Sequence, residues 1–180
     1  LTTADVADGK VDTGDVQVLA AKGNITLTNT GNDVVNSSKA ALVQTSEGNI
    51  DVTGNVIGAT TATLDCQKGH VSLTGDLTAN NGLAKIAASD SSEDGTVGVG
   101  NITVKGNVLS ATNGVTINAT QGNIQIGEAT TTASAVKAAK ALEITTTTAG
   151  SIDVYGNLQT TDSTSGTVTV SAENGSVSLT

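Results

Sequence analysis

The chain has 180 residues, enough for one domain with a buried core, but it contains no Phe, Trp, Met or Pro, and Tyr155 is its only aromatic residue. The core must therefore be built from Val, Ile, Leu and Ala, which suits a narrow, regularly stacked tube better than an ordinary globular core rich in aromatic side chains. The net charge of −9 excludes a nucleic-acid-binding protein, which needs a basic surface to displace counterions, and a charged fraction of only 14% argues against a disordered chain.

A five-residue phrase recurs along the chain: Gly, a polar residue, and then an aliphatic–polar–aliphatic triplet. A faint copy occurs at residues 9–13, and the first clear copy is Gly23-Asn24-Ile25-Thr26-Leu27. The clear copies occupy residues 23–27, 48–52, 69–73, 100–104, 122–126, 150–154 and 175–179. Their glycines are separated by 21 to 31 residues. The mean of about 25 lies in the range of solenoid repeats, and the uneven steps indicate insertions at surface corners.

Each repeat contains two further segments that resemble strands. A second Gly turn starts about six residues after the first, as in Gly54-Asn55-Val56, and a third segment follows, as in Ala62-Thr63-Leu64. The second segment recurs at residues 75–77, 106–108 and 156–158, and the third at 84–86, 115–117, 142–144 and 168–170. Three short strands and three corners per repeat predict one triangular coil.

The alternation within the strands predicts which side chains face the interior. In Ile50-Asp51-Val52 the two aliphatic side chains face one side and Asp51 the other, so aliphatic residues line the coil. Gly at the corners allows a positive φ, and the absence of Pro preserves every donor between coils. The sequence thus predicts an all-β, single-stranded parallel β-helix of about seven coils, roughly 34 Å long, forming one domain over residues 1–180. One column is expected to contain Ile25, Ile50, Val71, Ile102, Ile124, Ile152 and Val177.

Two segments depart from the repeat. Residues 89–95 are polar and acidic and are expected to form a loop that lengthens the fourth coil. Residues 133–142 are Ala-rich, which favours a helix by intrinsic propensity. A loop or an extended lead-in to Leu142-Glu143-Ile144 is the preferred interpretation, and a short helix on a corner is the alternative.

Few residues suggest chemistry. Cys66 is the only Cys and is expected to be a small buried hydrophobic residue, with an exposed thiol or an intermolecular bridge as the alternative. His70, the only His, replaces the corner Asn of other repeats and is interpreted as a polar turn residue. Asp51 and Asp153 share one outward position but are expected four coils apart, too far to act as a hydrolytic carboxylate pair. We therefore predict no catalytic, cofactor-binding or metal-binding residues, and no enzyme.

Three other patterns have simpler explanations than a binding site. Asp90, Glu93 and Asp94 could bind calcium, but the calcium-binding nonapeptide pattern is absent and a solvated acidic loop is preferred. The Thr runs at 130–132 and 145–148 could serve an ice- or sugar-binding face, but the outward positions mix Asp, Ser, Gln and Thr, so we attribute the runs to strand propensity. The glycosylation-type sequences at 24–26 and 101–103 follow from the repeat and are expected in strands.

The chain contains no signal peptide and no run of roughly 18 apolar residues that could span a bilayer. It begins at Leu1 without Met and stops within a strand-like phrase at Thr180. We therefore expect a segment of a longer repetitive protein.

The phrases Gly-Asn-Ile-Thr-Leu at 23–27, Gly-Asn-Val at 54–56 and Val-Thr-Ile-Asn-Ala at 115–119 resemble the haemagglutinin-like repeats of large bacterial exoproteins. These include filamentous haemagglutinin and related two-partner-secretion or autotransporter adhesins. The resemblance is one of pattern and composition and extends from about Gly9 to Thr180. It implies a right-handed parallel β-helix, exported to the cell surface or beyond. Several repeats are longer than the family's usual coil, and the family's N-terminal secretion region does not occur in this sequence.

The expected function is a structural shaft or fibre-forming module of an extracellular bacterial adhesin or surface filament, without catalysis or cofactor. Uncapped strand edges are templates for pairing, so the expected partners are neighbouring coils or subunits stacked end to end, including a homopolymer fibre. A host or cell-surface glycan or receptor is a further expected partner, whereas nucleic acid and membrane insertion are not expected. The alternative is a glycan-binding or polysaccharide-degrading β-helix, against which the single Tyr and the scattered insertions argue.

Overall fold

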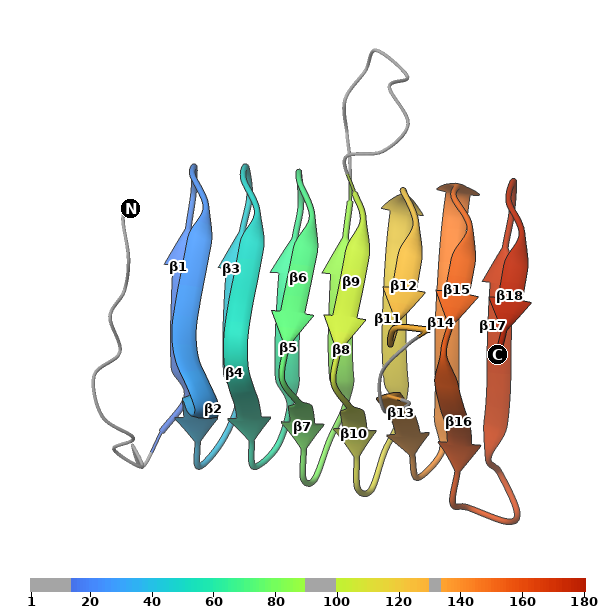
Figure 1. The fold of residues 1–180 in the computed structure, drawn as a ribbon. Coiled ribbons are helices and arrows are strands. Elements are labelled where there is room, and N and C mark those ends of the chain that lie inside the picture. Colours follow the sequence, from blue (N-terminus) through green and yellow to red (C-terminus); the bar gives the residue numbers. More distant parts are fainter. Residues whose placement is uncertain (1–13, 90–99, 130–133) are drawn as a thin grey trace.

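The computed structural model describes residues 14–89, 100–129 and 134–180, and in these ranges every regular element is a β-strand. The strands pair in parallel and wind into a β-solenoid of about six turns, which Figure 1 shows side by side from β1 to β18. The faint phrase at residues 9–13 and most of the acidic segment at 89–95 lie outside the described residues.

The strands form two sheets. A seven-stranded sheet contains, in spatial order, β1 (Val16–Ala20), β3 (Ala41–Thr45), β5 (Ala62–Cys66), β8 (Ala84–Ala88), β11 (Val115–Gln121), β14 (Ala141–Ala149) and β17 (Thr167–Ala172). An eleven-stranded sheet contains, in spatial order, β16 (Gly156–Thr160), β13 (Ser134–Ala138), β10 (Val108–Ser110), β7 (Leu77–Ala79), β4 (Ile50–Gly58), β6 (Val71–Thr74), β9 (Ile102–Lys105), β12 (Ile124–Ile126), β15 (Ile152–Val154) and β18 (Val177–Leu179), and β2 (Ile25–Ser37) pairs with β4.

The larger sheet consists of two stacks of strands. They are joined in one sheet because β2 and β4 are long enough to belong to both stacks. Residues 50–53 of β4 pair with β6, whereas residues 56–58 pair with β7. We call the stack that continues through β6, β9, β12, β15 and β18 the first stack, and the one that continues through β7, β10, β13 and β16 the second stack. The seven-stranded sheet is the third stack. The predicted three strands per coil correspond to these three stacks.

The expected aliphatic column is confirmed by the register of the first stack. Ile25 pairs with Ile50, Ile50 with Val71, and Val71 with Ile102. The column continues through Ile124 and Ile152 to Val177. Identical positions of successive repeats therefore lie directly above one another, as the period of the sequence predicts.

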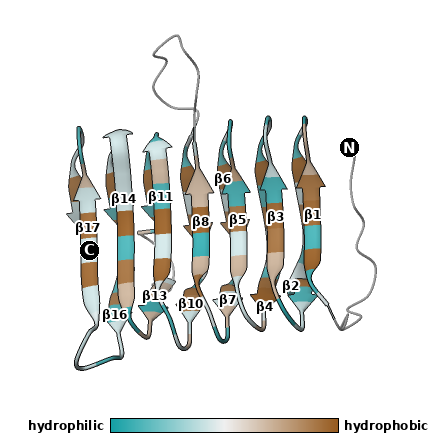
Figure 2. Ribbon diagram, turned by 180° about the vertical axis from the view of Figure 1, so that it is seen from behind, coloured by the Kyte–Doolittle hydropathy of each residue, from teal (hydrophilic) through white to brown (hydrophobic). Residues whose placement is uncertain are grey.

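Alternation along the strands places the aliphatic side chains inside. In β4 every second residue is buried, from Ile50 to Gly58, and the intervening residues are partly exposed. Figure 2 shows hydrophobic and hydrophilic bands alternating along the strands of the third stack. The largest fully buried side chains are all Leu or Ile, so the interior of the solenoid is built mainly from aliphatic side chains.

The short helix considered for residues 133–142 is wrong. Residues 134–138 form strand β13, and Ala141 begins β14 after a turn at Ala139 and Lys140. Val136 is fully buried and pairs with Val108, and Ser134 and Ala138 are buried beside it. Pairing with two neighbouring strands and burial of Val136 therefore outweigh the helix propensity of the Ala-rich segment.

Candidate functional site

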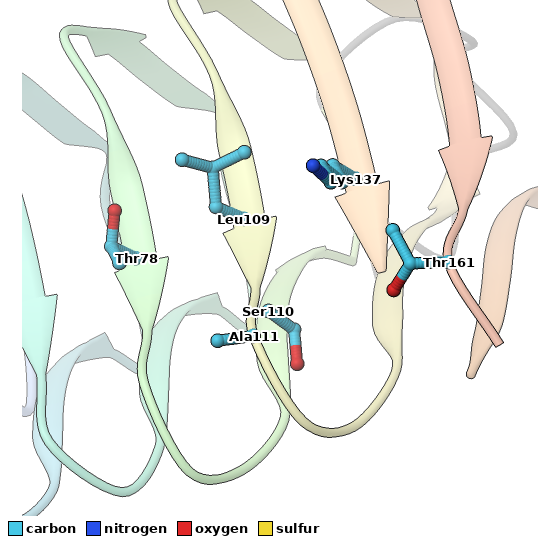
Figure 3. A pocket seen from close by; sticks show the side chains of 6 residues that line it. All are labelled: Thr78, Leu109, Ser110, Ala111, Lys137 and Thr161. Atoms are coloured by element: carbon cyan, nitrogen blue, oxygen red, sulfur yellow. The ribbon is translucent and has the colours of Figure 1, made fainter. Parts of the chain in front are cut away.

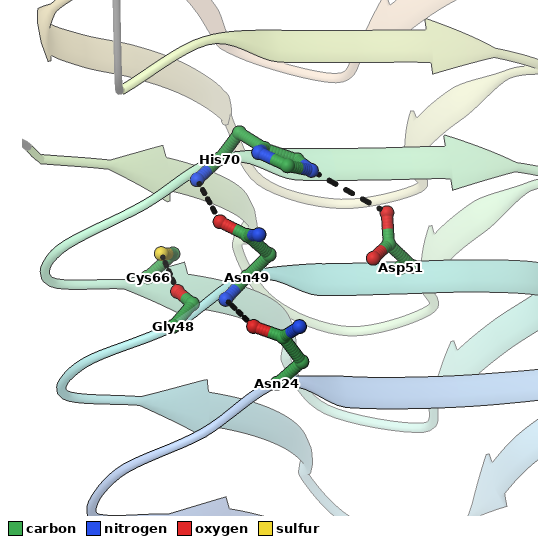
Figure 4. Close-up of polar contacts among 6 residues, drawn as sticks. All are labelled: Asn24, Gly48, Asn49, Asp51, Cys66 and His70. Atoms are coloured by element: carbon green, nitrogen blue, oxygen red, sulfur yellow. Dashed lines mark hydrogen bonds and ion pairs between the residues drawn. The ribbon is translucent and has the colours of Figure 1, made fainter.

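The most regular polar feature is a hydrogen-bonded ladder at the corner that precedes the first stack. The Oδ1 atom of Asn24 accepts a hydrogen bond from the Asn49 N–H at 2.9 Å, and Oδ1 of Asn49 accepts one from the His70 N–H at 3.1 Å (Figure 4). The ladder resumes with Asn123 N to Asn101 Oδ1, Ser151 N to Asn123 Oδ1, and Ser176 N to Ser151 Oγ. Each side chain thus satisfies a backbone donor of the next coil, which a turn would otherwise leave unpaired.

A second ladder lies at the corner that precedes the second stack. The Asp76 N–H donates to Oδ1 of Asn55 at 3.0 Å, and the Asn107 N–H donates to Oδ1 of Asp76 at 2.8 Å. Oδ1 of Asn107 in turn accepts a hydrogen bond from Ala135 N at 3.0 Å. Two of the three corners are therefore held together by side-chain oxygens that reach from coil to coil.

Glycine is required at the first of these corners by close approach of the backbones. Gly48 has a φ of 133°, and a Cβ atom there would collide with the carbonyl oxygen of Gly23 one coil away. Gly69 stands in the same relation to Gly48. A side chain at these positions would separate two coils.

Cys66 has a more specific environment than a small hydrophobic residue requires. It is fully buried, and its Sγ donates a hydrogen bond to the carbonyl oxygen of Gly48 at 3.0 Å (Figure 4). In the adjacent coil Thr45, which pairs with Cys66, donates through Oγ1 to the Gly23 carbonyl at 3.1 Å. Burial raises the pKa of the Cys66 thiol to about 11. The expectation of a buried Cys is confirmed, and the structure adds that its thiol satisfies a corner carbonyl.

His70 occupies the corner position that the sequence predicts. Its backbone N–H belongs to the ladder, and its Nε2 lies 3.6 Å from Oδ1 of Asp51. Both side chains are more than two-fifths exposed, so the contact is a solvated one of small energy.

Asp51 and Asp153 do not form a pair. The register runs from Asp51 through Ser72, Thr103 and Gln125 to Asp153. Four coil spacings separate the two aspartates by about 19 Å. The expectation that they are too far apart for joint hydrolysis is confirmed.

The structure does not describe all of the candidate sites considered in the sequence. Asp90, Glu93, Asp94 and Thr130–Thr132 lie outside the described residues. Within the described ranges no group of three or more His, Cys, Asp or Glu side chains could hold a metal ion. In the glycosylation-type sequences, Ile25-Thr26 and Ile102-Thr103 lie in β2 and β9, as expected, whereas Asn24 and Asn101 occupy the corner just before these strands and take part in the ladder.

Ion pairs also connect neighbouring coils. Glu47 lies 3.0 Å from Lys22 and 3.9 Å from Lys68, so one carboxylate bridges three coils. The hydrogen bond from Lys22 and its charge lower the pKa of Glu47. Lys85 in β8 pairs with Asp65 in β5 at 3.4 Å, and Lys105 in β9 pairs with Glu128, which follows β12, at 2.6 Å.

The last described coil has an open apolar surface. Val168, Val177 and Leu179 are 46%, 42% and 59% exposed, and β16, β17 and β18 each lack a described neighbour on one edge. A hollow of about 490 Å³ lies there, lined by Gly156, Asn157, Leu158, Val168, Val170 and Leu179.

No family model, curated protein or solved structure matches the chain. Among the described residues there is no helix with the length and apolar character needed to cross a membrane.

Proposed function

We propose that this chain is a structural shaft module of an extracellular bacterial adhesin or surface filament, of the haemagglutinin-like repeat type, without catalysis. The observation that supports the proposal is the unbroken aliphatic column from Ile25 to Val177, with one residue from each copy of the repeat in register. A rod in which every coil repeats the same contacts is suited to spanning distance rather than to surrounding a substrate.

The mechanical role depends on contacts between coils. Backbone hydrogen bonds of 2.8–2.9 Å connect Ile25 N to Asn49 O, Ile102 N to Asn123 O, and Ile152 N to Ser176 O. The two side-chain ladders and the buried aliphatic columns act in parallel with these bonds. Separating two coils therefore breaks many contacts together, which would make the rod stiff.

We further propose a right-handed winding with about seven coils of roughly 25 residues, one for each clear copy of the phrase. The partners are neighbouring coils or subunits stacked end to end, since the exposed edges of β16, β17 and β18 would be paired by a further coil. That coil could come from the same chain or from another subunit. The proposed location is extracellular, at the bacterial cell surface, where the module would bind a host or cell-surface glycan or receptor.

Force spectroscopy tests the shaft role. Handles at Gln17 in β1 and Thr169 in β17, both outward in the third stack, would pull along the long axis. We expect a rigid response followed by abrupt, coil-sized unfolding steps. A gradual, compliant extension at low force would contradict the proposal.

Location is tested separately by antibody labelling of intact and permeabilised cells of the source organism. Labelling of intact cells is expected. Labelling only after permeabilisation would contradict the extracellular assignment without affecting the mechanical one.

A glycan-binding role is the second candidate, and one observation favours it: the outer face of the second stack carries a hollow lined by side chains from several coils.

A further inference from the structure

A hollow of about 350 Å³ lies on the outer face of the second stack, lined by Thr78, Leu109, Ser110, Ala111, Lys137 and Thr161 (Figure 3). We call it the outer groove. Leu109 pairs with Thr78 on one side and with Lys137 on the other, so these three outward side chains come from three successive coils. The coil spacing of about 4.8 Å places the backbones of Thr78 and Lys137 roughly 10 Å apart along the axis.

The groove carries a cation that no carboxylate neutralises. Of the three lysines on described strands, Lys85 and Lys105 each pair with an acidic residue of a neighbouring coil, whereas Lys137 is exposed and has no acidic partner among the described residues. The outward column that contains Leu109 has no acidic residue: it comprises Asn36, Ile57, Thr78, Leu109, Lys137 and Gln159. The nearest carboxylates along the chain are those of Asp76, which accepts hydrogen bonds from Asn107, and Asp162, which accepts them from Thr164 and Ser165. On a chain of net charge −9, Lys137 is therefore a cation that remains available to an anionic ligand.

The remaining lining residues divide into a fixed floor and a free rim. The Oγ of Ser110 is buried, donates to the Gly82 carbonyl at 2.7 Å and accepts from Asn113 N at 3.1 Å, so it shapes the floor. The hydroxyls of Thr78 and Thr161 make no hydrogen bond to a described residue and are available at the rim. Leu109 and Ala111 provide an aliphatic surface between them.

We propose that the outer groove binds a carboxylate-bearing sugar of an acidic polysaccharide. The sugar carboxylate would lie at Nζ of Lys137, its C–H face on Leu109 and Ala111, and its hydroxyls at Thr78 and Thr161. A uronate ring combines a carboxylate, a C–H face and several hydroxyls within the dimensions of the groove. The volume lies at the lower end of small-ligand sites, which fits one or two sugar rings.

The repeating structure also matches a repeating ligand. A polysaccharide that follows the axis of the solenoid would advance by about one sugar per coil, because a pyranose ring is about as long as the spacing between coils, roughly 5 Å. No aromatic side chain lines the groove, so a single site should bind weakly, and a polymer that contacts several molecules should bind more tightly through multivalency. This inference does not depend on the shaft role.

The test is titration of the full chain with galacturonate oligosaccharides, followed by NMR chemical shifts of the backbone amides. We expect saturable shifts confined to β7, β10, β13 and the turn around Thr161, which weaken as salt is raised. A neutral galactose oligosaccharide of the same length should bind at least about tenfold more weakly, because it lacks the charged group that Lys137 would contact.

Three variants locate the interaction. Lys137→Gln should lose at least about tenfold in affinity, whereas Lys137→Arg, which keeps the charge, should remain within about threefold. Lys39→Gln is the matched control, because Lys39 is also exposed and has no ion pair among the described residues, but it lies at a corner outside the groove. It should bind as the wild type does.

Several results would overturn the proposal. They are the absence of binding to galacturonate and glucuronate oligomers, equal binding of the neutral oligomer, equal loss in Lys137→Gln and Lys39→Gln, or tighter binding of an oligoglutamate peptide than of the sugars. None of these would affect the force measurement on the shaft.

Discussion

An inner coil and the last coil of this protein use the same kinds of residue in the same columns but differ completely in burial. Ile102 and Val104 are fully buried, whereas Val177 and Leu179 in the same columns are 42% and 59% exposed. In the third stack, Leu142 is buried and its neighbour Val168 is half exposed. A single coil therefore provides only part of a core, and the next coil provides the rest.

The largest effect is expected from two substitutions that place Asp in the same column, one in an inner coil and one in the last coil. Ile102→Asp should destabilise the protein by at least about 3 kcal/mol, because it places an unpaired charge between two coils. Val177→Asp, in the same column at the open surface, should cost less than about 1 kcal/mol because water reaches its carboxylate. Chemical denaturation measures both. Similar losses in the two variants would contradict the account.

The next test concerns the corner glycines. Gly48→Ala should cost at least about 2 kcal/mol, because the new methyl group collides with the Gly23 carbonyl and the residue has a positive φ. Gly31→Ala is the control, since Gly31 also has a positive φ of 76° but nothing lies within 4 Å of the added Cβ. Its cost should be about 1 kcal/mol, from the left-handed backbone conformation alone. Equal decreases in melting temperature for Gly48→Ala and Gly31→Ala would indicate that the close contact between coils at Gly48 does not contribute to stability.

A smaller effect is expected in the ladder. Asn49→Ala removes the side-chain oxygen that accepts the His70 N–H but keeps the Asn49 N–H that donates to Asn24, and should cost about 1 kcal/mol. Asn81→Ala, at an exposed turn without such a bond, should change the free energy of unfolding by less than about 0.5 kcal/mol. If Asn81→Ala lowered the free energy of unfolding as much as Asn49→Ala does, the ladder hydrogen bonds would not contribute to stability as described.

The smallest effect is the pH dependence contributed by Cys66. Its pKa is raised from 9.0 to about 11 in the folded protein by burial, so the folded state holds the proton more tightly than the unfolded state does. Stability should therefore fall as the pH rises from about 9 towards 11. Cys66→Ala should lack this component, and denaturation of both proteins across this range gives the difference. Parallel pH profiles would show that the thiol is not buried as described.

The sequence predicts most of the fold because most repeats carry the same local pattern of a corner glycine followed by an alternating strand. Copies such as Gly48-Asn49-Ile50-Asp51-Val52 combine a corner glycine, a ladder residue and an alternating strand, and the seven clear copies all become strands of the first stack. Where this local pattern is missing, the prediction fails. Strand β3 begins Ala41-Leu42-Val43, in which the outward Leu42 is also apolar and no alternation is visible, and the second half of β2 follows a register shift between Thr28 and Asp33, so the pattern identifies neither. Strand β13 was obscured by its Ala content.

The outer groove could not be predicted for a different reason. Thr78, Leu109 and Lys137 are 31 and 28 residues apart in sequence, and these steps differ because the intervening corners differ in length. Only the register of the second stack brings them together. The outward face of a solenoid depends on neighbours from other coils, whereas its inward face is evident from the alternation within each strand.

The central claim is that successive turns stack in register, and distances between spin labels test it most directly. One label is placed at Thr26, and the second label at Gln125, Asp153 or Ser178 in three separate variants. All four positions lie in one outward column of the first stack, and the second label is four, five or six coils away from Thr26. The account predicts backbone separations of about 19, 24 and 29 Å, equal steps despite unequal numbers of intervening residues. Separations that follow the number of intervening residues, or that do not rise in equal steps, would contradict it.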